Sequence, residues 1–399
     1  MITRRRILQG AAGTAGALTA LGGPGMAFTA APMDRRLVMV ILRGGADGLA
    51  LVPAPGDPNF DLLRRGLFIQ DLHAGNIDLD GFFALHPKLT GLASLWAKGQ
   101  LAVVHATQTG YRNRSHFDAQ DLLENGLNTV SALADGWLNR ALGYFGRAEP
   151  RTGLAVGYGT PLILQGQTPI ATWAPRRLAR PDPDYLNKLM VISSADPAIS
   201  KALDQGIRSE KANRQRLGHL ETSRGGTTSR RAIAGLAEAA GRLLSAKTGA
   251  RVAALNIGGW DTHGYQNTAL SYRMATLDGA LMGLRAGLGP AWENTMVLVV
   301  TEFGRTAVPN GTNGTDHGTG SAMLLLGGAV RGGRVLADWP GLGKNDLYQG
   351  RDLKPTTDMR AVFKGVMMEH LGLDQAFVED RVFPDSRAVQ PLMNLVRTV

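Results

Sequence analysis

Residues 36–48 read RLVMVILRGGADG, and this stretch decides the class of fold. Its consecutive apolar residues, 37–42, include valine and isoleucine and are typical of a β-strand. A strand that is apolar on both faces indicates a central position in a parallel sheet that helices cover on both sides. Two glycines and Asp47 follow shortly, at the strand end where open α/β sheets bind their ligands.

Similar apolar strands alternate with helical patterns along the rest of the chain. Further strands are expected at 100–108, 251–259, 295–302 and 320–330, and helices at 89–98, 115–123, 232–245 and 272–288. Strands that alternate with helices favour right-handed crossovers between parallel strands. We therefore predict an α/β fold with a mostly parallel central sheet and helices on both faces.

The composition is that of a globular protein. Hydrophobic residues make up 44% of the 399 residues and charged residues 19%, which excludes disorder, collagen and a coiled coil. The formal net charge of +10 favours anionic partners such as phosphate or sulfate esters, acidic glycans or lipid headgroups. No basic helix carries the interleaved aromatic residues of a nucleic-acid reader, so no nucleic-acid partner is expected. Because the chain has no cysteine, disulfides, thiolate metal sites and a cysteine nucleophile are excluded.

The first 31 residues are expected to be an export signal and not part of the fold. Arg4, Arg5 and Arg6 precede a short apolar run rich in glycine and alanine, and small residues follow it. The run is too short for a membrane-spanning helix, which needs about 20 apolar residues. The arginine segment resembles a twin-arginine signal, so we expect the twin-arginine export machinery as a partner and a periplasmic or extracellular location. An ordinary amphipathic first helix is the alternative.

Residues 32–399 are expected to form a single domain with one insertion and no membrane-spanning segment. Between 204 and 231 the chain is polar and basic, and its segment 224–229 has the glycine, serine and threonine content of a hinge. We interpret this insertion as a small helical cap over the sheet. A solvated surface helix and loop would have the same composition.

Side chains suited to binding ions follow the predicted strands. Asp47 stands among glycines that allow close backbone approach to an ion, although a plain Gly-Asp turn would use the same residues. After the second strand, Ser115 starts a predicted helix beside Arg114 and His116. Because helix N-termini stabilise anions, we consider Ser115 a candidate nucleophile and His116 a candidate catalytic residue. A capping box formed with Asp118 also explains a serine at this position.

The later strands add carboxylates and histidines. Asp261 and His263 stand two residues apart in the loop GGWDTHG after the third strand, and this spacing lets both reach one cation. Glu302 ends the fourth strand, and Arg305 follows it as a candidate catalytic residue that binds anions. Each histidine of these loops could instead be satisfied by hydrogen bonds within its own loop.

Asp316 and His317 complete this pattern in the loop TDHGTG before the fifth strand. Carboxylates and imidazoles at neighbouring strand ends predict a site for a divalent cation: Zn²⁺, Mn²⁺, Ca²⁺ or Mg²⁺. Such an ion polarises an ester oxygen and activates a hydroxyl or water nucleophile. The candidate metal ligands are Asp47, Asp261, His263, Glu302, Asp316 and His317.

Several motifs of the chain occur in the same order in a large bacterial family. They are LRGGADGL, ALHPKLTGL, RSHFDAQD, ADGWLNRAL, GWDTHG, TEFGR and DHGTG, between about residue 37 and residue 371. On these motifs the chain resembles the family known as domain of unknown function 1501, which is similar in turn to the alkaline phosphatase and sulfatase superfamily. The resemblance implies an alkaline-phosphatase-like sheet with a nucleophile near Ser115 and metal ligands at Asp47, Asp261, His263, Glu302 and His317.

Two hypotheses from different classes follow. The first is an exported metal-dependent hydrolase of phosphate or sulfate esters or related anionic substrates, in which Arg305 and Arg114 neutralise the transferred group. The second is a catalytically inert exported protein that binds an envelope glycan, a lipid headgroup or a protein partner. The basic insertion and the absence of a histidine from TEFGR favour this second hypothesis. A formylglycine sulfatase is not expected, because no Cys or Ser stands in a C/S-x-P-x-R context.

Overall fold

The computed structural model describes residues 34–65, 67, 77–130, 135–146, 152–175, 183–193, 195–197, 199–201, 203–204, 207, 217, 229–247 and 249–397. The predicted export signal, residues 1–31, lies outside the described residues. So does most of the basic insertion at 204–231, and the interpretation of that insertion as a cap stays a prediction.

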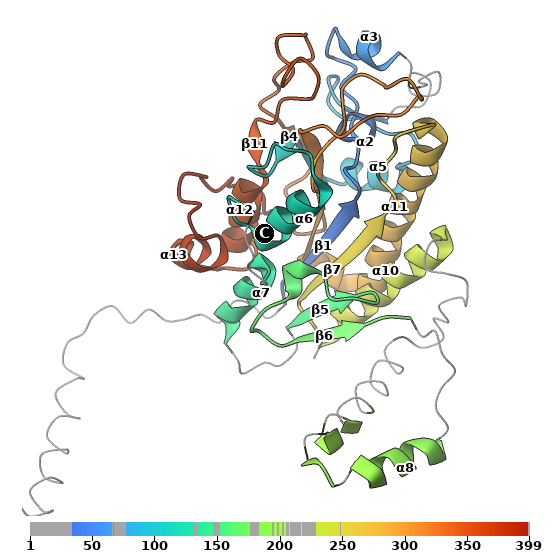
Figure 1. Cartoon of the computed structure of the whole chain (residues 1–399), viewed down its shortest axis with the longest axis vertical. Helices are drawn as coiled ribbons and strands as arrows, with labels where there is room; N and C mark the ends of the chain where they lie inside the picture. The colour runs from blue at the N-terminus through green and yellow to red at the C-terminus, as the bar shows by residue number, and fades with distance from the viewer. Residues whose placement is uncertain are drawn as a thin grey trace, which may run out of the picture. The chain divides into compact units, whose positions relative to one another are not determined.

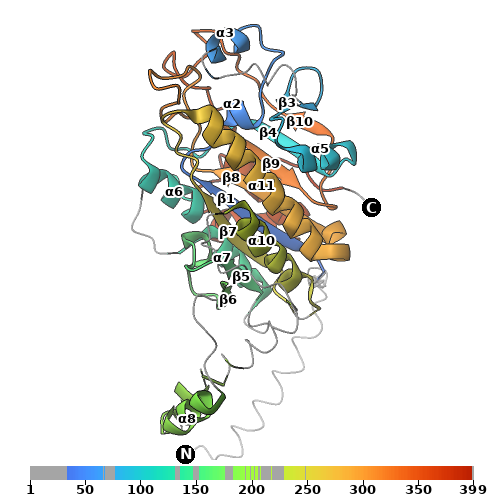
Figure 2. The same cartoon turned by 90° about the vertical axis from the view of Figure 1, so that its right-hand side faces the viewer.

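Nine strands of the described chain form one mixed sheet in the order β10-β4-β9-β8-β1-β7-β5-β6, with β11 paired to β4 (Figures 1 and 2). β1 is the strand expected from residues 36–48, and it pairs in parallel with β7 on one side and with β8 on the other. The strands are β1 (Arg36–Arg43), β4 (Leu101–Gln108), β5 (Gly153–Val156), β6 (Ile170–Trp173), β7 (Val252–Gly258), β8 (Thr295–Thr301), β9 (Ser321–Leu326), β10 (Arg334–Leu336) and β11 (Thr357–Asp358). A separate antiparallel pair joins β2 (Ile77–Asp78) to β3 (Ala84–Leu85).

β9 is the one strand of this sheet that runs against its neighbours: it is antiparallel to both β4 and β8. All other pairings in the sheet are parallel, which confirms the mostly parallel sheet. The direction of β9 matters for the site. Because β9 enters the sheet from the edge where β1, β7 and β8 end, the loop before it lies at that same edge.

Helices pack against both faces of the sheet, as predicted. Alternate residues of β1 belong to different cores: Val38, Val40 and Leu42 pack with residues of α5, α10 and α11, whereas Leu37, Met39 and Ile41 pack with residues of α7 and α12. Figure 2 shows α10 and α11 lying across one face. The helices are α2 (Gly48–Leu51), α3 (Phe60–Arg64), α5 (Thr90–Ala97), α6 (His116–Asn125), α7 (Trp137–Leu142), α8 (Pro183–Ser193), α10 (Arg230–Ser245), α11 (Gln266–Leu288), α12 (Met359–Glu369) and α13 (Gln375–Phe377). Short 3₁₀ or π turns span Gly143–Phe145, Leu162–Leu164, Gly289–Asn294 and Val378–Val382.

Two local predictions differ from the structure. α11 begins at Gln266, six residues before the expected start, because the loop 310–313 satisfies the first N–H groups: the amide of Tyr265 donates to Thr312 O and that of Gln266 to Asn313 O. The predicted capping box at Ser115 is wrong. Ser115 is the N-cap residue of α6, but its hydroxyl caps no helical N–H group.

Among the described residues, no helix is both long enough and apolar enough to cross a membrane.

Two buried histidines make the fold sensitive to acid. His105 Nε2 bonds Val52 O at 2.9 Å and His370 Nε2 bonds Arg36 O at 2.8 Å, and both side chains are fully buried. Burial lowers the pKa of each imidazole from 6.5 to about 4. The unfolded chain therefore takes up protons first as the pH falls, so stability is complete above pH 6.5 and is lost between pH 6.5 and about 4.

We expect each of these histidines to remove up to about 3 kcal/mol of unfolding free energy across that interval, at about 1.4 kcal/mol per pKa unit. Denaturant titrations at several pH values measure the loss, and the His370→Gln variant, which has no imidazole there, should lose correspondingly less than the wild type. Equal pH slopes for the two proteins would show that His370 is not a protonation site that couples to folding.

Candidate metal centre

The candidate site lies where β1, β7 and β8 end and where the loop before β9 returns to the sheet. The strand ends are level with one another, since Arg43 pairs with Gly258 and Leu42 with Thr301. Gly44 turns the chain out of β1 with a φ of +118°, and a Cβ at this position would lie 2.5 Å from the backbone nitrogen of Asp261. A glycine is therefore needed for the loops after β1 and β7 to approach each other.

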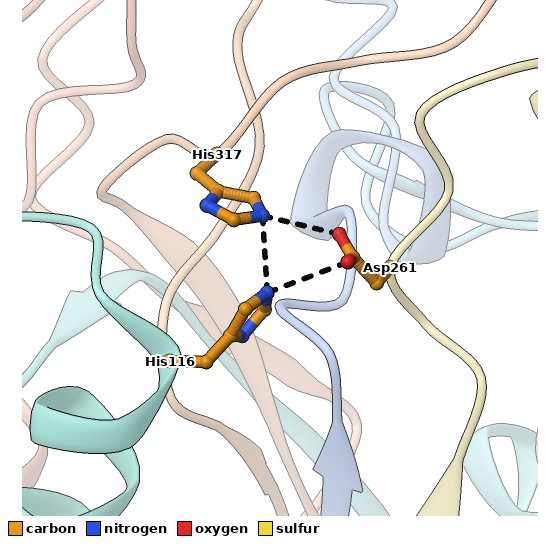
Figure 3. A group of neighbouring side chains, drawn as sticks. All are labelled: His116, Asp261 and His317. Atoms are coloured by element: carbon orange, nitrogen blue, oxygen red, sulfur yellow. Dashed lines mark hydrogen bonds and ion pairs between the residues drawn. The ribbon is translucent and has the colours of Figure 1, made fainter.

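The Nε2 atom of His317 faces the Nε2 atoms of two other histidines. His317 Nε2 lies 3.0 Å from His116 Nε2 and 3.1 Å from His263 Nε2. Asp261 faces the same point: its Oδ1 is 2.9 Å from His263 Nε2 and 3.1 Å from His317 Nε2. Figure 3 shows His116, which comes from the start of α6, meeting Asp261 and His317 from two other segments. The ligand-type atoms of these three residues all lie within 4.8 Å of one another, a group that could hold a metal ion.

The other ring nitrogen of each histidine faces a hydrogen-bond acceptor. His116 Nδ1 lies 2.9 Å from Glu302 Oε1, His317 Nδ1 lies 3.1 Å from Arg114 O, and His263 Nδ1 lies 3.4 Å from Asp316 Oδ1. An Nδ1–H that donates outward leaves the lone pair of Nε2 directed inward. Lone pairs that face one another at about 3 Å repel unless a cation lies between them. Metal-binding histidines use this same arrangement, in which an outer carboxylate or carbonyl fixes the ring.

Glu302 is a fully buried carboxylate whose surroundings also fit a metal centre. It accepts hydrogen bonds from Gly44 N, Gln120 Nε2 and the hydroxyl of Thr301. Among the described residues its only ionic partner is His116. Burial acts to raise its pKa, but the bonds from His116 and Gln120 outweigh burial, so the pKa of Glu302 lies below its ordinary value. A buried carboxylate needs a compensating charge nearby, and a cation bound to His116 would supply it.

Asp261 is held from the protein side by Arg305. The Arg305 Nη1 donates to Asp261 Oδ1 at 2.9 Å, and the arginine is almost completely buried. Its Nε and Nη2 have no protein partner. Burial acts to raise the pKa of Asp261, but the charges of Arg305 and His263 and the hydrogen bonds from Arg305 and His317 together outweigh burial, so the pKa of this carboxyl lies below its ordinary value. The side chains of Asp261 and His263 are 44% and 48% exposed, so this side of the cluster is open to solvent.

The two histidines at the centre titrate in opposite directions. The hydrogen bond that His116 donates to Glu302 raises the pKa of His116 above its ordinary value. Burial, followed by the charges of His116 and Arg305, lowers the pKa of His317. The pKa of His116 is therefore shifted upward and that of His317 downward within the same cluster.

The structure brings most of the predicted site residues together. His116, Asp261, His263 and His317 form the inner group, and Glu302, Asp316 and Arg305 surround it. Asp47 is engaged elsewhere: its Oδ2 lies 2.5 Å from Arg64 Nη2 and 2.6 Å from Gln266 Nε2, and its Oδ1 caps α2. Asp47 therefore forms a buried ion pair with Arg64.

The residues just before His116 make contacts of their own. Near Ser115, the Tyr111 hydroxyl donates to Asp118 Oδ2 at 2.7 Å. The Arg114 guanidinium donates to the buried carboxylate of Asp352 at 2.6 Å. Arg114 also adopts a φ of +61°, which is uncommon for a residue with a side chain, and this conformation presents its carbonyl to His317.

Gln266 is a site residue that sequence reasoning missed. Its buried side chain accepts from the hydroxyls of Thr262 at 2.9 Å and Thr315 at 2.5 Å, and it donates to Asp47. It thus ties the loop that carries Asp261 to the loop that carries His317. No local signal marks it, because two of its three partners, Thr315 and Asp47, lie 49 and 219 residues away in the sequence.

Comparison with known proteins identifies the family. The model of the family described as protein of unknown function (DUF1501) matches residues 34–383, so the chain belongs to this family. No curated protein sequence matches it. Among solved structures it is similar to a phosphonate monoester hydrolase of Agrobacterium radiobacter, with 13% identity, a TM-score of 0.36, and coverage of 85% of this chain and 74% of that one.

Proposed function

We propose that this protein is an exported hydrolase that uses a divalent metal ion to cleave phosphate or sulfate esters or related anionic substrates. The observation that carries the proposal is the convergence of three Nε2 atoms and Asp261, with each Nδ1 held from outside. A purely structural histidine cluster has no need of three outer acceptors that turn the lone pairs inward.

His116, His263, His317 and Asp261 would hold the metal. Three imidazoles and one carboxylate favour Zn²⁺ or Mn²⁺ over Ca²⁺ and Mg²⁺, which prefer sites made of oxygen ligands. When bound, the ion would supply a Lewis acid for the ester oxygen and lower the pKa of a nucleophile.

The residues around the cluster have roles that follow from their contacts. Arg305 orients Asp261, and its positive charge, buried directly behind that carboxylate, would attract an anionic group. Ser115, next to His116 at the start of α6, is the candidate nucleophile, and its hydroxyl is not used to cap the helix. Glu302 and Asp316 hold the rings of His116 and His263.

The location is part of the proposal. The arginine-rich, apolar start of the sequence supports export through the twin-arginine machinery to the periplasm or beyond, which carries proteins that have already folded. Cleavage of the signal, predicted between residues 27 and 31, would leave the described residues intact.

The test is elemental analysis of the mature protein, purified without chelator, followed by a screen of aryl phosphate, aryl sulfate and phosphodiester substrates. We expect about one equivalent of Zn²⁺ or Mn²⁺ per chain and metal-dependent release of the aryl group. Asp261→Ala with His263→Ala should lose both. The matched control is Asp385→Asn, which removes one carboxylate away from the cluster and should lose neither. Folded protein without metal would overturn the proposal and favour a metal-free binding protein, whereas stoichiometric metal without hydrolysis would favour a metal-containing binding protein.

A further inference from the structure

Two aromatic side chains next to residues of the metal centre are almost completely exposed. Phe117, which directly follows His116 in α6, is 84% exposed, and Tyr265, two residues after His263, is 80% exposed. They are the two most exposed large hydrophobic side chains among the described residues. Single exposed apolar residues are common on protein surfaces, but two large aromatic ones beside the same cluster of ligand-type residues indicate a binding surface.

The backbone ties both aromatic residues to the cluster. His116 Nε2 and His263 Nε2 each lie about 3 Å from His317 Nε2. Consecutive Cα atoms are about 3.8 Å apart, so the Cα of Tyr265 lies within about 7 Å of that of His263, and Phe117 is closer still to His116. The two aromatic residues are therefore carried by the two segments that bring these histidines together.

Tyr265 has an unusual backbone conformation for an aromatic residue. Its φ of +46° lies in the left-handed region, which glycine and asparagine adopt at lower cost. Its amide donates to Thr312 O at 3.0 Å, which any residue other than proline could do at this position. Because the side chain is exposed and the conformation is unfavourable for it, neither packing nor backbone geometry explains a tyrosine here. Contact with a ligand does explain it.

A partly exposed cation lies beside the same cluster. Arg351 Nη2 donates to His317 O, and Arg351 Nε donates to Asp352 Oδ1 at 3.0 Å. The Arg351 side chain is 46% exposed, and its Nη1 donates to no described residue. Asp352 is fully buried and already binds Arg114 through its other oxygen. Two guanidinium groups thus share one carboxylate, which leaves one positive charge next to His317.

The turn 348–352 holds Arg351 in place. Backbone hydrogen bonds join the two ends of the turn in both directions, and Ala307 N donates to Arg351 O at 3.0 Å. Of the three arginines around the cluster, the side chain of Arg305 is fully buried and that of Arg114 is 18% exposed. Arg351 is therefore the arginine that a ligand can contact most easily.

We propose that the open side of the metal centre recognises an anionic ester carried on a ring. Arg351 binds the anionic group, and Phe117 and Tyr265 contact the ring to which this group is attached. Aromatic side chains bind flat apolar faces, which aromatic compounds and sugars both offer. The inference rests on the proposed function for the position of the anionic group at the metal centre, and it adds the substrate class.

The test is calorimetric titration of the full mature chain, with and without Zn²⁺, with phenylphosphonate and methylphosphonate. Both ligands carry the same anionic group on a carbon atom, and only the first has a ring. We expect phenylphosphonate to bind at least about tenfold more tightly. Phe117→Ala with Tyr265→Asn should lose this preference and bind both ligands alike. Arg351→Gln should weaken both by about tenfold and keep the preference.

Two controls separate recognition from folding. Tyr265→Asn should unfold at or above the temperature of the wild type, because asparagine tolerates the left-handed conformation. Met393→Ala removes a side chain that is 41% exposed at the opposite edge of the sheet, where the adjacent Asn394 N bonds Glu369 and Arg35 donates to Glu369 O. This variant should bind both phosphonates as the wild type does.

The source of the ring is tested by competition against phenylphosphonate. Phenylmethanesulfonate and sulfoquinovose carry the same CH₂–sulfonate group on an aromatic ring and on a sugar ring, and the stronger competitor identifies the kind of ring. The inference is overturned if the Phe117→Ala, Tyr265→Asn variant keeps the preference for phenylphosphonate, or if Arg351→Gln binds as the wild type does.

Hydrolysis distinguishes this inference from the proposed function. If the protein prefers phenylphosphonate but cleaves no ester, the proposed function fails and the binding surface stands. If it cleaves aryl esters and the Phe117→Ala, Tyr265→Asn variant has an unchanged KM, the proposed function stands and the inference is wrong. We expect this variant to raise KM for an aryl ester by at least about tenfold with little change in kcat.

Discussion

Replacing His317 with alanine is expected to abolish stoichiometric metal binding and to reduce any metal-dependent hydrolysis by more than about a hundredfold. His317 Nε2 is the one ring atom in contact with both other imidazoles and with Asp261, so its loss removes the common neighbour of the group. Changes to outer residues of metal sites already cost about 10–100-fold in affinity, and loss of a ligand costs more. Elemental analysis and calorimetric titration with Zn²⁺ measure the effect.

Glu302→Gln is expected to weaken metal binding less than His317→Ala does. Glutamine keeps the size of the side chain and one oxygen acceptor for His116 Nδ1–H, but it removes the buried charge. Affinity for Zn²⁺ should fall by about 10–100-fold while the metal-free protein unfolds at a temperature close to that of the wild type. Full metal content in His317→Ala would contradict the ligand assignment, and unchanged affinity in Glu302→Gln would contradict the role of the outer carboxylate.

Asp47→Asn is expected to destabilise the protein by about 3–5 kcal/mol without emptying the metal site. Asp47 and Arg64 are each about 1% exposed, so the asparagine variant leaves the guanidinium buried without its counter-charge. Chemical denaturation measures the loss of unfolding free energy. Metal content per folded chain should stay at the wild-type value, since the contacts of Asp47 are with Arg64, Gln266 and the start of α2.

A double variant separates charge burial from metal binding at this position. Arg64→Met added to Asp47→Asn removes the unpaired cation and should recover most of the lost stability, because replacing both partners of a buried pair is far milder than removing one. If Asp47→Asn instead kept the stability of the wild type and lost the metal, Asp47 would be a metal ligand. That is the role predicted for Asp47 from the glycine-rich motif at the end of β1.

The fold was predictable where the local pattern was strong. The apolar runs of β1, β4, β7 and β8 are long enough to be recognised alone, and their burial on both faces follows from their composition. β5 and β6 have only four residues each, and their pairing with β7 and with each other, which no local pattern shows, makes them strands. The antiparallel direction of β9 could not be predicted either, because an apolar run does not show in which direction its strand enters a sheet.

The site was predictable in its residue types but not in its division of roles. Asp261, His263 and His317 stand out as ligand-type residues in glycine-rich loops. The sequence pattern does not show that Glu302 contacts a histidine from behind, or that Asp47 faces Arg64, because both depend on side-chain directions fixed by partners far along the chain. His116 was predicted as a catalytic group beside Ser115, and the geometry also places its Nε2 in a group of atoms that could hold a metal ion.

The inner group is assembled from residues 116, 261–263 and 317, and this spread has a consequence for folding. His116 and His317 are separated by 201 positions, so no fragment of the chain and no early folding intermediate with local contacts alone contains the site. Closing such long loops is entropically unfavourable, and the binding site exists only once β1, β7, β8 and β9 are paired. An ion bound there, as proposed, would stabilise the complete sheet and nothing smaller, by an amount that grows with its free concentration. Chelation should then lower the stability of the whole sheet more than that of any single element.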